Sequence, residues 1–141
     1  MSSPALAFHH LGLACRSISK EARHLASLGY AQVGETFEDP LQGVRGCFLE
    51  GPGPRLELLE PLAGSTTLDG FLARGVKMYH QAFETPCLDA ALEWHLGRRA
   101  RVVSPPKPAV AFGGRRVAFI ALPTMLIVEL IEAPQEDASP Q

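Results

Sequence analysis

The sequence predicts an α+β fold in which one unit, made of a strand, a helix and three further strands, occurs twice. The order of strand-like and helix-like segments in the first half of the chain recurs in the second half. A histidine lies near the start of each copy, His10 and His80, 80 − 10 = 70 positions apart. A glutamate lies near the end of each copy, Glu57 in "LELLEP" and Glu129 in "VELIEAP", 129 − 57 = 72 positions apart. This common period indicates a duplicated module and not an extended array of short repeats.

The elements of the first copy follow from its local patterns. "FHHLGLAC" alternates as a strand does and ends near Arg16. The next segment, "SISKEARHLASLGY", starts with serine, spaces Leu and Ala as a helix does, and has Gly29 where a helix would stop. Turn residues in "EDPLQG" and "GPGP" then separate three predicted strands, "YAQVGETF", "VRGCFLEG" and "RLELLEP".

The second copy repeats this order after a connecting segment, "LAGSTTLDGFLARG", which predicts a short helix over residues 67–73. We expect a strand in "VKMYHQAFET", a helix in "CLDAALEWHLGRRA", and strands in "RVVS", "RRVAFIAL" and "MLIVELIEA", with "PPKPAVAFGG" as a long, stiff loop. The predicted organisation is a single domain over residues 1–133. It consists of a module at 6–62, a linker at 63–74, a module at 75–133, and a disordered polar tail at 134–141.

Composition excludes several classes of function. With 141 residues, 46% hydrophobic, 20% charged and a net charge of -2, the chain has no electrostatic attraction to nucleic acid or to an anionic membrane. No stretch approaches the roughly 20 apolar residues that span a bilayer, and "MSSPALAFHH" is unlike a signal peptide, so we expect a cytoplasmic location. The three cysteines, widely spaced, indicate neither a disulfide framework nor a thiolate zinc site.

The repeated histidine and glutamate indicate a metal site. A carboxylate within a strand as apolar as "MLIVELIE" is costly to bury without a partner or a metal, and the same holds for Glu57. Any one of the four residues, taken alone, is more typical of a solvent-facing or hydrogen-bonded position. Four such residues at corresponding places in two copies can converge about a pseudo-two-fold axis. Two imidazoles and two carboxylates suit a divalent ion such as zinc, cobalt, manganese, nickel or iron.

The ordered motifs of the chain resemble a known superfamily. "HHLGLA", "QGVRGCFLEG", "RLELLEP", "MYHQAFET", "GGRRVAFI" and "MLIVELIE" are together similar to the vicinal oxygen chelate (glyoxalase/bleomycin resistance/dioxygenase) superfamily, and within it most of all to the methylmalonyl-CoA epimerases. The resemblance extends over nearly the whole chain apart from the tail. It implies the glyoxalase fold, in which two βαβββ modules form a curled mixed sheet around a metal cleft. It also implies a homodimer and a metal site with the ligands His10, Glu57, His80 and Glu129.

The resemblance further implies an activity, an epimerisation alpha to a thioester carbonyl through a metal-stabilised enolate, with Glu129 as a catalytic residue and an acyl-CoA thioester as the small-molecule substrate. The sequence departs from the epimerase pattern at one point. Where that pattern has a proton-transferring glutamate, three positions after the glycine of "QGV", this chain has Gly46. Three interpretations stay open: Glu129 moves the proton alone, Glu38 or Glu50 substitutes, or the chemistry differs. At about 3.3 Å per strand residue, Glu50 lies roughly 13 Å beyond Gly46, which makes it a poor substitute.

Two other members of the superfamily are alternatives. One is a glyoxalase I-like lactoylglutathione lyase, although the aromatic-rich helix typical of such enzymes is absent from "SISKEARHLASLGY". The other is a binding protein that does not transform its ligand. An extradiol dioxygenase is disfavoured because it uses two histidines and one carboxylate. Lys107 and Arg45 are weaker candidates for substrate binding, since a cation could meet a carboxylate or a CoA phosphate.

Overall fold

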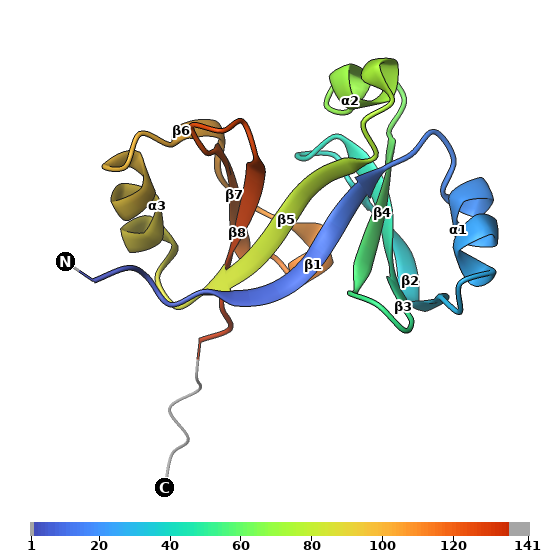
Figure 1. Cartoon of the computed structure of the whole chain (residues 1–141), viewed down its shortest axis with the longest axis horizontal. Coiled ribbons are helices and arrows are strands. Elements are labelled where there is room, and N and C mark those ends of the chain that lie inside the picture. The colour runs from blue at the N-terminus through green and yellow to red at the C-terminus, as the bar shows by residue number, and fades with distance from the viewer. Residues whose placement is uncertain (1, 136–141) are drawn as a thin grey trace, which may run out of the picture.

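The computed structural model describes residues 2–135, and these form an eight-stranded mixed sheet in the order β2-β3-β4-β1-β5-β8-β7-β6. The sheet curls without closing on itself, as Figure 1 shows. The predicted α+β fold with a duplicated unit of strand, helix and three strands is confirmed.

The first half of the chain contains four strands and two helices. They are β1 (Ala7–Ala14), α1 (Ile18–Ala26), β2 (Ala31–Asp39), β3 (Val44–Glu50), β4 (Leu56–Pro61) and the short α2 (Asp69–Arg74). Helix α1 begins after Ser17, whose side chain accepts a hydrogen bond from the backbone N–H of Lys20 at 3.3 Å. A second free N–H of this helix end, that of Ile18, donates to the Glu60 carboxylate of β4 at 2.9 Å, which ties the helix to the sheet.

The second half repeats the arrangement. It contains β5 (Met78–Thr85), α3 (Leu88–Leu96), β6 (Arg101–Pro108), a 3-10 turn at Val110–Phe112, β7 (Arg116–Ala121) and β8 (Ile127–Glu132). The two halves meet where β1 and β5 pair antiparallel, and each of these strands pairs parallel with the last strand of its own half, β4 or β8. The first and last strands of each half are therefore neighbours at the middle of the sheet.

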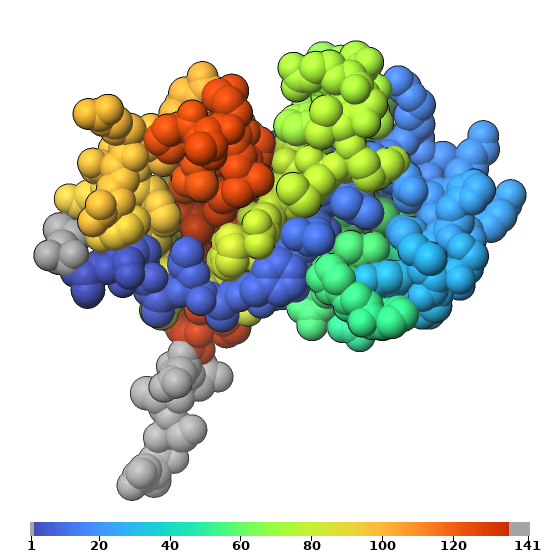
Figure 2. All heavy atoms as spheres, in the orientation of Figure 1, coloured from blue at the N-terminus to red at the C-terminus, as the bar shows by residue number. Residues whose placement is uncertain are grey.

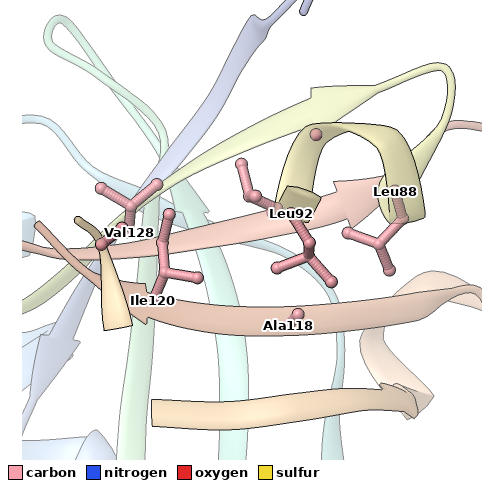
Figure 3. Packing of buried hydrophobic residues seen from close by; sticks show 8 residues of the cluster. Leu88, Leu92, Ala118, Ile120 and Val128 are labelled. Carbon is pink, nitrogen blue, oxygen red and sulfur yellow. The ribbon is translucent and has the colours of Figure 1, made fainter. Parts of the chain in front are cut away.

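Two of the apolar clusters lie between the outer face of the curl and helices α1 and α3. Helix α1 contacts β2, β3 and β4, and α3 contacts β7 and β8. Figure 3 shows Leu88 and Leu92 of α3 packed over Ala118, Ile120 and Val128 of the sheet. Because side chains alternate along a strand, residues between these buried positions point to the opposite, inner face.

The segment "PPKPAVAFGG" differs from its expected loop conformation. Strand β6 continues through Pro105, Pro106 and Pro108 and pairs with β7 by way of two register shifts. A strand tolerates prolines at the edge of a sheet, where a missing N–H leaves no neighbouring strand unpaired, and β6 is the last strand on its side. Lys107 therefore lies on a strand, opposite Val117, and not on a loop.

Other features of the described residues bear on the expectations from sequence. No helix within residues 2–135 is long and apolar enough to cross a membrane. All three cysteines have free thiols. The predicted tail at 134–141 falls mostly on residues 136–141, which lie outside the described part of the chain.

Candidate metal centre

Strand pairing brings the repeated histidines and glutamates together on the inner face of the sheet. Gly12 of β1 pairs with Glu57 on one side and with His80 on the other. Ala82 of β5 occupies the corresponding place in the second half, since it pairs with His10 and with Glu129. Each glutamate is turned inward because its strand neighbours face the helix side, as Val128 and Leu130 do under α3.

Small residues at this crossing make room for the imidazoles. A Cβ atom added to Gly12 would lie 2.2 Å from Cε1 and 2.4 Å from Nε2 of His80, far inside contact distance. Glycine is therefore needed at position 12 because the His80 ring lies against its backbone.

The four side chains converge on one point. His10 Nε2 lies 3.0 Å from His80 Nε2, 3.0 Å from Glu57 Oε1 and 3.3 Å from Glu129 Oε1. His80 Nε2 lies 3.4 Å from Glu57 Oε1 and 3.1 Å from Glu129 Oε1. These four donor atoms are all within 4.8 Å of one another, and all four residues are buried. No other group of three or more such ligands is found among residues 2–135.

The donor set fits a divalent ion. With metal–ligand bonds of about 2.1 Å, two ligands at a right angle are about 3.0 Å apart and two at the tetrahedral angle about 3.4 Å apart. The five separations between 3.0 and 3.4 Å span this interval. Apart from the two imidazole Nε2 atoms, the buried Glu129 Oε1 has no hydrogen-bond partner among the described residues, so it can act as a ligand.

The electrostatics of the cluster also favour a cation. Two carboxylates and two neutral imidazoles carry a formal charge of about −2, and a buried charge needs compensation by a cation or by protons. Burial disfavours the charged imidazolium of His10, but the Glu57 and Glu129 carboxylates outweigh burial and raise the pKa of His10 to about 9. The pKa of His80 is raised by the same two carboxylates against the effect of burial. Without a metal, the cluster therefore holds protons in its place.

A bulge in β1 gives the His10 ring a neighbour that strand alternation did not predict. The register with β5 shifts between Phe8 and His10, so His9 is the extra residue and its ring does not turn to the opposite face. His9 Nδ1 lies 2.8 Å from His10 Nδ1, and Arg55 Nη1 lies 3.2 Å from His9 Nε2. Such contacts to the outer nitrogen of a ligand orient its ring.

The cavity at the cluster is small and mostly apolar, with a free volume of about 30 Å³. Three of the four clustered residues line it, together with aromatic side chains and one further acid. The lining includes Phe37, Asp39, Tyr79, Phe112 and Phe119 beside Glu57, His80 and Glu129. A space of this size holds about one water-sized group, so a larger ligand needs the adjoining outer pocket or a shift of the aromatic walls.

An outer pocket of about 320 Å³ adjoins this cavity, and the two share Gln42, Thr67, Tyr79 and Phe119 as lining residues. Lys107 and Ser104 of β6 line its far side. In Figure 2 the surface is indented between the turn joining β7 to β8, coloured orange-red, and the segment that carries α2, coloured yellow-green. Lys107 is thus placed beside the route to the cluster, whereas Arg45 is paired with Glu38 and Glu60 and lines neither space.

Sequence reasoning missed Asp39, which is 2% exposed and lines the inner cavity. Its place in "EDPLQG", directly before a proline, is typical of a turn residue, and no sequence signal marked it as part of a site. Phe37 was missed as well. Its ring covers Gly46, the position at which the epimerase pattern has its glutamate.

Comparisons with known proteins agree with the fold. A model of the Glyoxalase/Bleomycin resistance protein/Dioxygenase superfamily matches residues 9–119. An ethylmalonyl-CoA/methylmalonyl-CoA epimerase of Cereibacter sphaeroides is 26% identical over 114 residues, which are 79% of this chain and 85% of that protein.

Two solved structures extend the similarity. The methylmalonyl-CoA epimerase of Mycobacterium tuberculosis has a TM-score of 0.77 at 22% identity and is matched over 99% of this chain and 97% of that one. A variant of the Streptomyces coelicolor methylmalonyl-CoA epimerase, in complex with 2-nitronate-propionyl-CoA, has a TM-score of 0.73 at 26% identity over 93% of this chain and 100% of that one.

Proposed function

Because the chain belongs to the Glyoxalase/Bleomycin resistance protein/Dioxygenase superfamily, we propose that it is a metal-dependent epimerase that moves a proton alpha to a thioester carbonyl. The observation that carries the proposal is the convergence of His10, Glu57, His80 and Glu129 at ligand spacing in a buried, mostly apolar cavity. The similarity to methylmalonyl-CoA epimerases at 26% identity supports the reaction class.

In this proposal the four clustered residues hold one divalent ion of the cobalt, manganese, nickel, zinc or iron group. When bound, such an ion supplies Lewis-acid polarisation of a carbonyl oxygen. Glu129 is proposed as a catalytic group as well as a ligand, since its carboxylate lines the cavity in which the acyl unit would bind. The apolar walls keep water from the acidic carbon.

Lys107 is proposed to bind the substrate at the outer pocket. Arg115 is paired with Glu84, and Arg116 with Glu132 and Asp89, whereas Lys107 has no ion pair within residues 2–135. An acyl-CoA thioester carries phosphates, and its malonyl-type acyl group carries a carboxylate, so either anion suits a free ammonium group. We also propose that the protein is a homodimer, which light scattering on the purified chain tests.

One observation favours a second candidate, a small-molecule binding protein that does not transform its ligand. The glutamate expected from the epimerase pattern is replaced by Gly46, and the Phe37 ring takes up the adjoining space. This candidate keeps the metal and the cavity but predicts no turnover.

The two candidates differ in hydrogen exchange. The protein is dialysed with cobalt(II), its metal content is measured by elemental mass spectrometry, and methylmalonyl-CoA is then incubated with it in deuterated water. We expect about one ion per chain and enzyme-dependent deuterium at C2. Deuterium incorporation no faster than in a protein-free sample, despite bound cobalt, would reject the epimerase in favour of the binding protein.

Glu129→Gln supplies the matched variant and Glu132→Gln its control. Both change a carboxylate of β8 to an amide, but Glu132 lies on the surface in an ion pair with Arg116. Loss of cobalt and of exchange in the first variant only is the expected result. Equal losses in both variants would mean that the effect comes from the strand and not from the site.

A further inference from the structure

We propose that Asp39 is the second proton-transfer residue, acting on the face of the substrate opposite to Glu129. The inference rests on the proposed function, because it names the group that the epimerisation needs and that Gly46 cannot supply. Five observations carry it.

Position 46 cannot regain a side chain in this fold without rearrangement. A Cβ atom on Gly46 would lie 2.5 Å from Cζ of Phe37 and 2.9 Å from Cδ2 of Leu59. Phe37 pairs with Gly46 across β2 and β3, so the aromatic ring takes the space that a longer residue at 46 would need. The carboxylate must therefore come from another position.

The two acids considered from sequence point away from the cavity. The side chain of Glu38 is 58% exposed and lies 2.9 Å from Arg45 Nη2. The side chain of Glu50 is 52% exposed and lies 3.2 Å from Arg55 Nε. Both carboxylates are at the solvent surface in ion pairs, and neither residue lines the inner cavity.

Asp39 reaches the same part of the inner face by another route. On β2 it follows Phe37 by two residues and pairs with Val44, which precedes Gly46 by two residues on β3. Asp39 is thus the diagonal neighbour of Gly46, a relationship that places two residues about 7–8 Å apart on one face of a sheet. It is 2% exposed and lines the cavity with Glu57 and Glu129.

The Asp39 carboxylate is also held in a fixed orientation. Oδ1 accepts a hydrogen bond from the Gln42 backbone N–H at 3.2 Å, and Oδ2 accepts one from the Val110 backbone N–H at 2.9 Å. A carboxylate has about four acceptor sites, so one N–H on each oxygen leaves capacity for a substrate proton. A fixed carboxylate beside the acidic carbon is what proton transfer requires.

Asp39 and Glu129 approach the cavity from different halves of the sheet, since β2 and β8 are separated by four strands in its order.

Epimerisation would use the two carboxylates on opposite faces of the acidic carbon, C2. One carboxylate takes the C2 hydrogen as a proton, and the electron pair of the broken C–H bond moves into the thioester carbonyl. The other residue, in its carboxylic acid form, gives its proton to the opposite face of C2. The net charge of the pair is unchanged, and only the residue that holds the proton differs.

The test is the variant Asp39→Asn, assayed with each C2 epimer of methylmalonyl-CoA separately in deuterated water. Asparagine keeps an oxygen for one of the two backbone N–H groups but cannot accept a proton from carbon. We expect epimerisation to fall by about 100-fold or more. We also expect deuterium exchange to persist from the one epimer whose hydrogen faces Glu129. A merely structural defect would reduce exchange from both epimers equally.

The adjacent exposed residue supplies the control, Glu38→Gln, which should leave both rates unchanged. Cobalt content and melting temperature show whether the Asp39→Asn variant is folded. If it is not, it is replaced by Asp39→Ser, whose hydroxyl can also accept a hydrogen bond from a backbone N–H. Epimerisation within about three-fold of the unmodified protein, or equal loss of exchange from both epimers, overturns the assignment of Asp39. If the unmodified protein shows no exchange from either epimer, the proposed function itself is wrong. That result differs from a failure of the Asp39 assignment, in which the unmodified protein is active.

Discussion

The close approach of His80 to Gly12 makes Gly12→Ala an informative substitution. The added methyl group would lie 2.2, 2.4 and 2.6 Å from three atoms of the His80 ring. Ordinary carbon contacts are about 3.5–4.0 Å, so the ring must retreat by more than about 1 Å. It has little room, because the ring centroids of Tyr79, His10 and Phe119 are only 4.8, 5.2 and 5.2 Å away.

Two effects are expected from this shift. Overfilling a packed site costs about 1–3 kcal/mol, so the free energy of unfolding of the metal-free protein should fall by that amount in urea titrations. Metal ligands tolerate errors of about 0.2 Å, so displacing His80 Nε2 by about 1 Å should weaken cobalt binding by at least about 10–100-fold. The visible spectrum of the cobalt form reports that affinity.

The control for this substitution is Gly70→Ala on α2. A methyl group there meets no described atom closer than Arg74 Nη2, at 3.5 Å, and alanine within a helix is about 0.5–1 kcal/mol more favourable than glycine. We expect unchanged cobalt binding and unchanged or slightly higher stability. If Gly12→Ala matched this control in both assays, the inference that glycine is needed to seat the His80 ring would be wrong.

Three further results are expected. Leu130→Ala should lower the free energy of unfolding by about 2–5 kcal/mol in urea titrations but leave the cobalt stoichiometry unchanged. The reason is that Leu130 is fully buried on the helix side of β8, on the face opposite to Glu129. A loss of cobalt would contradict this separation of the two faces. The melting temperature of the metal-free protein should fall as the pH rises from about 6.5 to 9. The pKa of His10 is raised to about 9 in the folded state, so protonation of His10 stabilises the fold fully below the ordinary pKa of 6.5, and this stabilisation is lost as the pH rises to 9. A melting temperature in differential scanning calorimetry that did not change with pH would contradict this. Lys107→Ala should raise the KM for methylmalonyl-CoA by about ten-fold with little change in kcat, while Lys20→Ala on α1 should change neither.

The internal repeat made the convergence of the two histidines and two glutamates predictable. Each of His10, Glu57, His80 and Glu129 carries little information alone, but equivalent positions in two modules meet at the crossing of β1 and β5. The positions of the strands along the chain and the face of each side chain follow from alternation and turn residues, which are local properties of the sequence. The convergence of all four side chains is a consequence of those local properties together with the duplication.

The rest of the site depends on departures from regular geometry. His9 lies beside His10 because a bulge interrupts the alternation of β1, and the sequence "FHHLGLAC" does not mark where a bulge falls. Asp39 becomes part of the cavity because the turn at Val110 reaches across from the other half of the sheet, a contact 71 residues away in the chain. The continuation of β6 through its prolines depends on that strand being at the edge, which no local pattern states.

The three prolines of β6 restrict how copies of this chain can assemble. An open sheet has free edges, and a free edge with unpaired N–H groups can recruit a strand from another molecule. Pro105, Pro106 and Pro108 carry no N–H, so the outer edge of β6 offers few donors for such a strand. Extension of the sheet by a strand of another chain at the β6 edge is therefore disfavoured. The other edge strand, β2, has no proline, so a second chain that extended the sheet would do so at β2 and would leave the Lys107 side of the outer pocket open to solvent and to ligand.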